Sequence, residues 1–469
     1  MASVPSPLDP DQDDVDLLIT NGRVVTMDPE RRIFVGGAVA IAGTLIRAVG
    51  ATSQLRRTWP GAPALDAAGG FVTPGLVNAH QHLTGDPLAW SCIPDNLIPG
   101  SSIFDWSIPL HASEGPEDER LAATLVAAES ARNGVTMLVE AGTLSHPHAV
   151  AAALTDVGVR GTIGMWGWDI EAGPLTAPAP EALGRLESLL GDFPAGGQVE
   201  AWVTLVGHSL ASDELLAGAA DLARRAGAKM TMHLSPTSSD PEVYLQRTGR
   251  RPIVHLERLG VLGPHLLLAH AVWIDDAEME ALLASRTAVA YCPWAYLRLG
   301  QGVTAHGRHP ELYARGGRVA LGCDATNASD AVDLLRAAAL AAGLAKERHI
   351  DPTQFGAHEA FEMATVAGAE AVGMGDRIGS LEAGKLADIV IHSPSVAHWS
   401  SDPALALVWG TDGRTVRHVF VGGRQIVRDG RCVTVDHDEV LARARAASES
   451  LLARAGITVP TRWPIVAGD

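Results

Sequence analysis

The sequence predicts an α/β protein in which a (β/α)₈ barrel of the TIM type is joined to a small β-sandwich domain built from both ends of the chain. Two observations predict this fold. Between residues 74 and 375, short apolar segments alternate with Ala- and Leu-rich stretches at helical spacing. On both sides of that region, short β-branched segments are broken by turn residues. The central region, at about 300 residues, lies within the size range of such barrels.

The two ends of the chain share one pattern. Residues 1–14 are rich in Pro and Asp and contain no basic-then-apolar run, so we expect a mobile tail without a signal peptide. Residues 15–73 read as consecutive hairpins broken by Asn-Gly, Asp-Pro and Gly-Gly. Short strands with a Gly-Gly turn return within residues 376–469. We therefore expect residues 15–73 and 376–469 to form one composite β-domain, and residues 74–375 to form the barrel.

The barrel region contains eight candidate strands. They are residues 75–79, 135–140, 160–165, 199–206, 229–233, 266–270, 288–291 and 319–324. Helical spacing is clearest between them at residues 117–132 and 211–225. A doubly wound open sheet is the alternative, but no GxGxxG fingerprint opens the first unit.

Composition excludes several classes of function. The 469 residues contain 36 Lys and Arg against 54 Asp and Glu, a formal net charge of −18, which argues against a general nucleic-acid or anionic-membrane binder. No stretch approaches the roughly 18 uncharged apolar residues of a membrane span. The 4 cysteines lie far apart without a CxxC pair, which argues against a disulfide framework and favours a reducing, cytoplasmic location.

Histidine and aspartate residues close four of the candidate strands. The first strand is followed by His80 and His82, and later strands end at His233, His270 and Asp324. The carboxyl ends of barrel strands form one face, so these side chains are expected to converge there. Residues i and i+2 of an extended segment point the same way, so the imidazoles of His80 and His82 can reach one ion.

This combination is more informative than any one histidine. Eighteen histidines give about 0.7 His-x-His pairs by chance, and the chain has two. The other pair, His146 and His148, is expected at the solvated start of a helix. Three histidines and one aspartate at strand ends fit a nitrogen and oxygen site for Zn²⁺, or less often Fe²⁺ or Mn²⁺.

Several motifs resemble one known family. Residues 74–82 (PGLVNAHQH) resemble the opening motif of the amidohydrolase superfamily, and residues 378–390 (IGSLEAGKLADIV) resemble its return into the small β-domain. Residues 233–235 (HLS), 268–271 (LAHA) and 321–324 (LGCD) resemble its motifs on strands five, six and eight. The motifs occur in order over about residues 16–435. They are most similar to the branch that contains guanine deaminase, S-adenosylhomocysteine deaminase and triazine hydrolases.

The resemblance implies roles for particular residues. One divalent metal per chain would be held by His80, His82, His233 and Asp324, with Asp324 also accepting a proton. His270 would hydrogen-bond the metal-bound water or the group being polarised. His208, after strand four, lies where this branch places a substrate-contacting histidine. No lysine lies near residues 203–208 to bridge a second metal, which favours a single ion. The resemblance also implies a homodimer.

Two departures from the branch bear on the substrate. The branch has a proton-donating glutamate three residues after the strand-five histidine, whereas this chain has Pro236. After strand seven it has Cys292-Pro-Trp-Ala-Tyr296 in place of Ser-Asn, so Tyr296 is expected to form a bulkier pocket wall. Three explanations stay open: the substrate is electrophilic enough to need no such acid, Asp324 moves every proton, or another acid substitutes, for which Glu140 at the end of the second strand is the candidate. The alternative for Glu140 is a carboxylate paired with a neighbouring group or facing water.

The predicted activity is hydrolysis of a small molecule. Metal-activated water would attack an sp² carbon and cleave a C–N bond of a heterocycle or amide-like group, as in deaminases and amidohydrolases. Cleavage of a C–Cl bond, as in triazine hydrolases, is the alternative chemistry. A non-catalytic scaffold is the alternative of another class, and the retained ligands argue against it. The H-x-E and P-C-x-x-C pattern of base-editing zinc deaminases is absent.

Overall fold

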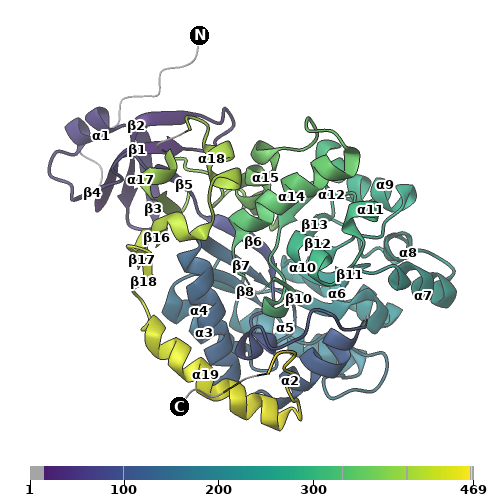
Figure 1. Cartoon of the computed structure of the whole chain (residues 1–469). Coiled ribbons are helices and arrows are strands. Elements are labelled where there is room, and N and C mark those ends of the chain that lie inside the picture. Colours follow the sequence, from purple (N-terminus) through teal and green to yellow (C-terminus); the bar gives the residue numbers. More distant parts are fainter. Residues whose placement is uncertain (1–14, 99, 330, 398–399, 465, 467–469) are drawn as a thin grey trace.

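The computed structural model describes residues 15–98, 100–329, 331–397, 400–464 and 466. The tail predicted at residues 1–14 lies outside these described residues. Figure 1 shows two parts: a sheet in which purple N-terminal strands lie beside yellow-green C-terminal strands, and a larger part whose strands are surrounded by helices. None of the helices within the described ranges is both long and apolar enough to cross a membrane.

The larger part contains the predicted barrel strands. These are β6 (Leu76–Gln81), β7 (Val135–Glu140), β8 (Arg160–Ile163), β9 (Val199–Ala201), β10 (Val203–Gly207), β11 (Met230–Leu234), β12 (Leu266–His270), β13 (Ala288–Tyr291) and β14 (Arg318–Leu321). Neighbours pair in parallel from β6 to β9 and from β10 to β14. The predicted fourth strand is divided at Trp202 into β9, which pairs with the preceding strand β8, and β10, which pairs with the following strand β11. The Trp202 N–H donates to the Ile163 carbonyl of β8 at 3.0 Å.

Contacts between the last and first strands close the ring. Gln81 and Asp324 form a parallel bridge. The N–H groups of Cys323 and Asp324 both donate to the His80 carbonyl, at 3.2 and 2.9 Å. Counting β9 and β10 as one interrupted strand, eight strand positions follow one another around the barrel, as predicted.

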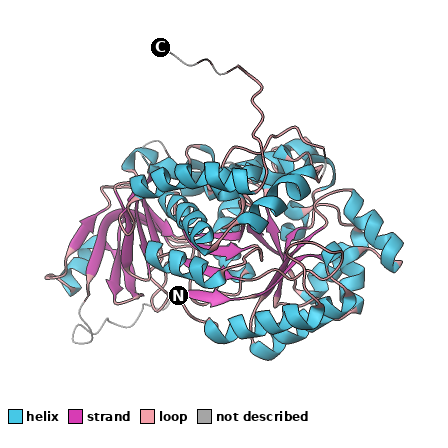
Figure 2. Ribbon diagram, turned by 90° about the horizontal axis from the view of Figure 1, so that it is seen from below, coloured by secondary structure: helices cyan, strands magenta, loops and turns pink. Residues whose placement is uncertain are grey.

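Helices cover the outside of the barrel strands, which Figure 2 shows with the separate sheet to one side. The α-helices up to the last barrel strand are α1 (Thr52–Thr58), α2 (Ile108–Ser113), α3 (Pro116–Arg132), α4 (Pro147–Val157), α5 (Ala179–Asp192), α6 (Asp213–Ala226), α7 (Ser239–Thr248), α8 (Pro252–Arg258), α9 (Asp276–Ser285), α10 (Pro293–Arg298), α11 (Val303–His306) and α12 (His309–Ala314). Those after it are α13 (Thr326–Ser329), α14 (Leu334–His349), α15 (Ala357–Ala364), α16 (Val366–Ala371), α17 (Pro394–Ala397), α18 (Pro403–Trp409) and α19 (His437–Arg454). Short 3₁₀ segments are η1 (Asp86–Ala89), η3 (His208–Leu210) and η4 (Gly413–Thr415), and η2 (Ser102–Ser107) is a π-helix.

Both ends of the chain contribute to one nine-stranded sheet, as predicted. Its strands are β1 (Leu17–Val25), β2 (Ile33–Ala42), β3 (Leu45–Ala51), β4 (Ala64–Asp66), β5 (Phe71–Pro74), β15 (Ile389–His392), β16 (Val416–Val421), β17 (Arg424–Arg428) and β18 (Arg431–Cys432). The two ends meet where β15 pairs antiparallel with β5. Because β5 ends at Pro74 and β6 begins at Leu76, the chain passes directly from this sheet into the barrel.

A buried ion pair also connects the two parts. Arg160 at the start of β8 donates to both carboxylate oxygens of Asp388, at 2.9 and 3.2 Å, and the Gly422 N–H donates to the same carboxylate at 2.7 Å. The side chains of Arg160 and Asp388 are 8% and 2% exposed. Helix α19 leaves the sheet and packs on the barrel, where Val440, Ala444 and Leu451 join the apolar cluster that includes Leu121 of α3.

Candidate metal centre

The histidines and the aspartate that follow the barrel strands meet at one end of the barrel. His80 lies in β6, and His82 follows the last residue of that strand. His233 lies in β11 and His270 ends β12, whereas Asp324 follows the end of β14. The carboxyl ends of parallel barrel strands form one face, so the strand positions account for this convergence.

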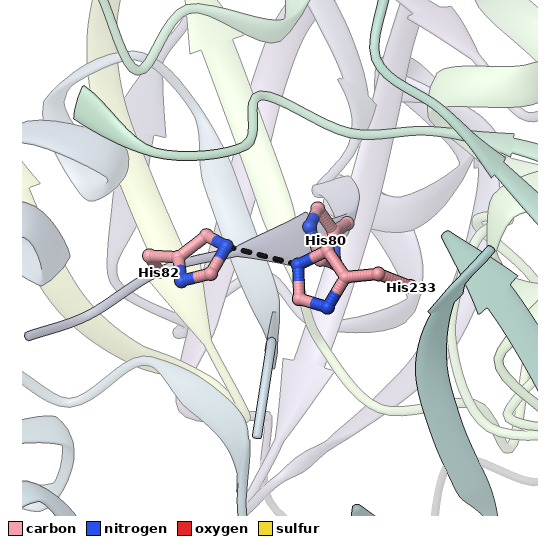
Figure 3. Close-up of side chains that lie close together, drawn as sticks. All are labelled: His80, His82 and His233. Carbon is pink, nitrogen blue, oxygen red and sulfur yellow. Dashed lines mark hydrogen bonds between the residues drawn. The ribbon is translucent and has the colours of Figure 1, made fainter. Parts of the chain in front are cut away.

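The side-chain atoms of these residues are close enough to share one ion. His80 Nε2 and His82 Nε2 each lie 3.4 Å from Asp324 Oδ1, and His270 Nδ1 lies 3.9 Å from Asp324 Oδ2. His82 Nε2 lies 3.2 Å from His233 Nε2, the contact dashed in Figure 3. One ligand atom from each of His80, His82 and His233 lies within 4.8 Å of the others, and the same holds for His80, His270 and Asp324. Imidazole nitrogens and a carboxylate oxygen are ligands that suit Zn²⁺.

The hydrogen bonds of the rings support the same interpretation. His233 Nδ1 contacts the Val206 carbonyl, which can only accept, so Nδ1 carries the hydrogen and Nε2 presents its lone pair to the centre. Both ring nitrogens of His80 are buried without a hydrogen-bond partner among the described residues. Buried polar atoms normally have a partner, so nitrogens left open at this point fit a metal ion.

Gln81, between the two histidines, points to the opposite side of the strand and stabilises the backbone around Asp324. Its side-chain amide donates to the Asp324 carbonyl at 2.6 Å and accepts a hydrogen bond from Asn78 at 2.9 Å. Asn78 Oδ1 in turn accepts from the N–H of Cys323 at 3.1 Å. The Asp324 backbone has a φ of 67°, a strained left-handed conformation that these contacts hold in place.

Burial sets the ionisation of the site. It lowers the pKa of His80, drives that of His233 well below its usual value and lowers the pKa of His270 to about 3, so these imidazoles are neutral. For His80 and His233, neutral is the form that binds a metal. Burial would raise the pKa of Asp324, but the imidazoles of His80 and His82 beside its carboxylate hold that pKa well below its usual range. The pKa of His82 is raised: burial opposes the rise, and Asp324 outweighs burial.

His270 is held by a residue that the sequence analysis did not single out. His270 and Ala271 have φ angles of 80° and 51°, and His309 Nε2 donates to the His270 carbonyl at 2.5 Å. The His309 ring stacks on Tyr291 at 4.1 Å between centroids. His309 begins helix α12, between β13 and β14, and no sequence pattern links a helix-start histidine to a carbonyl 39 residues earlier.

His208 is buried beside the metal centre. It begins η3, is 2% exposed, and its Nδ1 lies 3.4 Å from the His233 carbonyl. Its Nε2 is buried without a partner among the described residues, and burial lowers its pKa. A neutral imidazole with an unpartnered nitrogen can hydrogen-bond a polar group of a substrate. The substrate contact of His208 stays a prediction.

Tyr296 and Glu140 lie near the centre with their polar atoms engaged. The Tyr296 ring is 5.6 Å from that of His270, and its hydroxyl accepts the Cys292 N–H at 2.9 Å. Glu140 is fully buried, and its carboxylate accepts hydrogen bonds from the N–H groups of Gly142 and Thr143 at 2.7 and 3.1 Å. Burial raises the pKa of Glu140 to about 7. The substrate contacts predicted for both residues stay predictions.

The second His-x-His pair is separate from this site. His148 lies in the first turn of α4, its side chain is 67% exposed, and its Nε2 lies 3.2 Å from Asp192. The expectation of a helix start is confirmed.

Comparison with known proteins gives the family to which these motifs correspond. Residues 71–426 match the amidohydrolase family, and residues 37–62 match the bacterial imidazolonepropionase-like composite domain. The 5-methylthioadenosine/S-adenosylhomocysteine deaminase of Syntrophobacter fumaroxidans is 33% identical over 92% of this chain and 97% of its own length. The 5′-deoxyadenosine deaminase of Methanopyrus kandleri is 30% identical over 81% of this chain and 86% of its own length.

Solved structures give the same result for the fold. An adenosine deaminase of Xanthomonas campestris with bound zinc superposes with a TM-score of 0.88 at 25% identity, covering 94% of this chain and 99% of that one. The atrazine chlorohydrolase of Arthrobacter aurescens TC1, complexed with zinc, superposes with a TM-score of 0.83 at 24% identity, covering 92% of this chain and all (100%) of that one, a likeness of fold alone.

Proposed function

Because the chain belongs to the amidohydrolase family, we propose that it is a zinc-dependent hydrolase that cleaves a C–N bond, other than a peptide bond, in a small heterocyclic or amide-like molecule. The observation that carries this proposal is the convergence of His80, His82, His233 and Asp324 within a few ångströms at one end of the barrel. The relatives named for deaminase activity and the zinc-bound adenosine deaminase structure support it.

The residues of the centre have different roles in hydrolysis. His80, His82, His233 and Asp324 would hold one zinc ion. When bound, zinc lowers the pKa of water from 15.7 toward about 7 and so supplies hydroxide at neutral pH. Asp324, ionised at neutral pH, accepts the proton of the attacking water and returns it to the leaving nitrogen. His270 Nδ1, buried without a partner among the described residues, is available to hydrogen-bond charge developing at the attacked carbon.

The substrate class follows from Pro236. The relatives named above are deaminases of adenosine derivatives. In such a ring, addition at carbon is helped by protonating the neighbouring nitrogen, and the Pro236 side chain cannot donate a proton. We therefore place the substrate among molecules whose carbon is already electrophilic, such as activated amides, imides and substituted triazines. A chlorotriazine fits the same requirement, so C–Cl hydrolysis is the second candidate.

A substrate panel tests this function. Zinc-loaded protein is assayed on S-adenosylhomocysteine, 5′-deoxyadenosine, guanine, hydantoins, aryl amides and chlorotriazines for release of ammonia, amine or chloride and for ring-opened acids, with Asp324→Asn as the matched control. We expect ammonia or amine release from an activated amide or triazine, or ring opening of a cyclic imide, and little reaction with the purines. Chloride release alone would assign the second candidate. Purine deamination with kcat/KM above about 10⁴ M⁻¹s⁻¹ would contradict the substrate class.

A homodimer and a cytoplasmic location belong to the same proposal. The dimer is supported by the family resemblance, and the location by the wide spacing of the cysteines in the sequence. Light scattering of the purified chain measures the first, and a mass of one chain would exclude it.

A further inference from the structure

A chain of two hydrogen bonds leads from His82 to a buried carboxylate. His82 Nδ1 lies 3.2 Å from the hydroxyl of Thr143, and that hydroxyl lies 3.0 Å from Glu140 Oε1. Thr143 is 2% exposed and Glu140 is fully buried. Because both side chains are buried, the direction of these hydrogen bonds is set by the groups themselves.

The direction of the hydrogen bonds determines which nitrogen of His82 carries the hydrogen. Glu140 Oε2 accepts the Gly142 N–H and Oε1 accepts the Thr143 N–H, so both oxygens act as acceptors and the single hydroxyl hydrogen of Thr143 is donated to Oε1. The hydroxyl oxygen is then left with lone pairs, and it accepts from His82 Nδ1–H. His82 Nε2 therefore has a free lone pair, and this is the atom that faces Asp324 and His233.

The backbone around Glu140 is built to hold this arrangement. Glu140 is the last residue of β7, and the turn that follows returns the N–H groups of Gly142 and Thr143 to its carboxylate. Gly142 has a φ of 90°, and a Cβ placed there would lie 2.7 Å from Thr204, so only glycine permits the turn. The Thr84 hydroxyl donates to the Thr143 carbonyl at 3.2 Å and so also holds the backbone of Thr143 in place.

We propose that Thr143 and Glu140 are positioning residues, which hold the His82 ring in the tautomer and orientation that bind the metal. Groups that accept a hydrogen bond from the non-coordinating nitrogen of a metal-binding histidine orient its ring and increase the basicity of the coordinating nitrogen. The inference rests on the proposed function in that it takes His82 to be a metal ligand. It gives Glu140 a role through Thr143 and His82 in place of direct proton donation to substrate.

Zinc affinity of the full-length chain tests this role without any substrate. Zinc is removed with a chelator and titrated back against a chromogenic competitor at about pH 8, where Glu140 is ionised. Thr143→Val keeps the shape and removes the hydroxyl, and we expect zinc to bind about 10- to 100-fold more weakly. Thr143→Ser keeps the hydroxyl and should bind as the wild type does. Thr287→Val removes another buried hydroxyl, just before β13 at the opposite end of the barrel, and should leave the affinity unchanged.

The outcomes separate the two proposals. Equal zinc affinity in wild type and Thr143→Val, with zinc lost in His82→Ala, overturns the positioning role and leaves the metal site in place. A wild-type chain that binds no zinc overturns both. Circular dichroism and the Tm of the metal-free chains identify variants that fail to fold, and Thr143→Ala then replaces Thr143→Val. The absorption spectrum of the cobalt-substituted chain gives a second readout, because a rotated His82 changes the bands of the bound Co²⁺.

Discussion

His82 and His233 face each other through their Nε2 atoms at 3.2 Å, while the Nδ1 atoms of both rings are engaged by Thr143 and by the Val206 carbonyl. With both Nδ1 atoms engaged, the two Nε2 atoms direct their lone pairs toward one point, where both can bind the same cation. The carboxylate of Asp324 lies 3.4 Å from His82 Nε2 and supplies negative charge beside that point. The arrangement of these three side chains therefore suits a divalent metal ion.

Removing either histidine should empty the centre. His82→Ala and His233→Ala each remove a nitrogen ligand, and the zinc content of the purified chain should fall from about one equivalent to a small fraction of it. His148→Ala, an exposed histidine of α4, is the matched control and should keep its zinc. Elemental analysis gives the content. A full equivalent in the His82→Ala, His233→Ala double variant would exclude this set of ligands.

Asp324 should matter more for turnover than for folding. Asp324→Asn keeps the size of the side chain and one oxygen but removes the proton acceptor, so kcat should fall by about 10²- to 10⁴-fold. His270→Ala should lower kcat to a similar extent, because it removes the hydrogen-bond donor beside the attacked carbon. Steady-state kinetics on zinc-replete protein measure both. Near wild-type kcat in Asp324→Asn with zinc bound would show that another group moves the proton.

The ion pair between Arg160 and Asp388 should stabilise the junction of the barrel with the sheet. Asp388→Ala leaves the guanidinium of Arg160 buried without its partner, which should lower the free energy of unfolding by about 3–5 kcal/mol. Arg185→Ala breaks the exposed pair with Glu181 and should cost less than about 1 kcal/mol. Urea denaturation measures both variants. Equal losses would show that burial of the first pair has no energetic consequence.

Stability should fall in mild acid, in part because of His392. This histidine ends β15, and burial lowers its pKa to about 4, below the value of about 6.5 in the unfolded chain. Between these values the unfolded chain binds the extra proton, so stability is full above about pH 6.5 and declines as the pH falls toward 4. On going from about pH 7.5 to 5, the wild type should lose about 2 kcal/mol more than His392→Gln. Parallel declines in the two proteins would contradict this assignment.

The sequence predicts the barrel and the metal centre well for a physical reason. Each barrel strand is marked in the sequence by a short run of apolar residues. The residue that ends such a strand lies on the active-site face of the barrel, whatever its position in the chain. His80, His233 and Asp324 could therefore be brought together before any contact was known. The division of the fourth strand at Trp202 has no such signal, because it depends on which neighbour each half pairs with.

The supporting residues could not be predicted in the same way. Thr143 and His309 act through hydrogen bonds to residues 61 and 39 positions away, from a loop and from the start of a helix. Neither position has a periodic or spacing pattern in the sequence. Glu140 was predicted at the correct end of the barrel, but the turn that engages its carboxylate depends on the φ of Gly142, which only the structure shows.

The most direct test of the central claim is to titrate zinc into the metal-free chain while measuring hydrolysis of the panel substrate that is turned over fastest. If His80, His82, His233 and Asp324 hold one catalytic ion, the rate of hydrolysis should be negligible without metal and should rise linearly to a plateau at one zinc per chain. Asp324→Asn should stay near the baseline throughout. Full activity of the metal-free chain, or a rate that does not depend on zinc, would contradict the account.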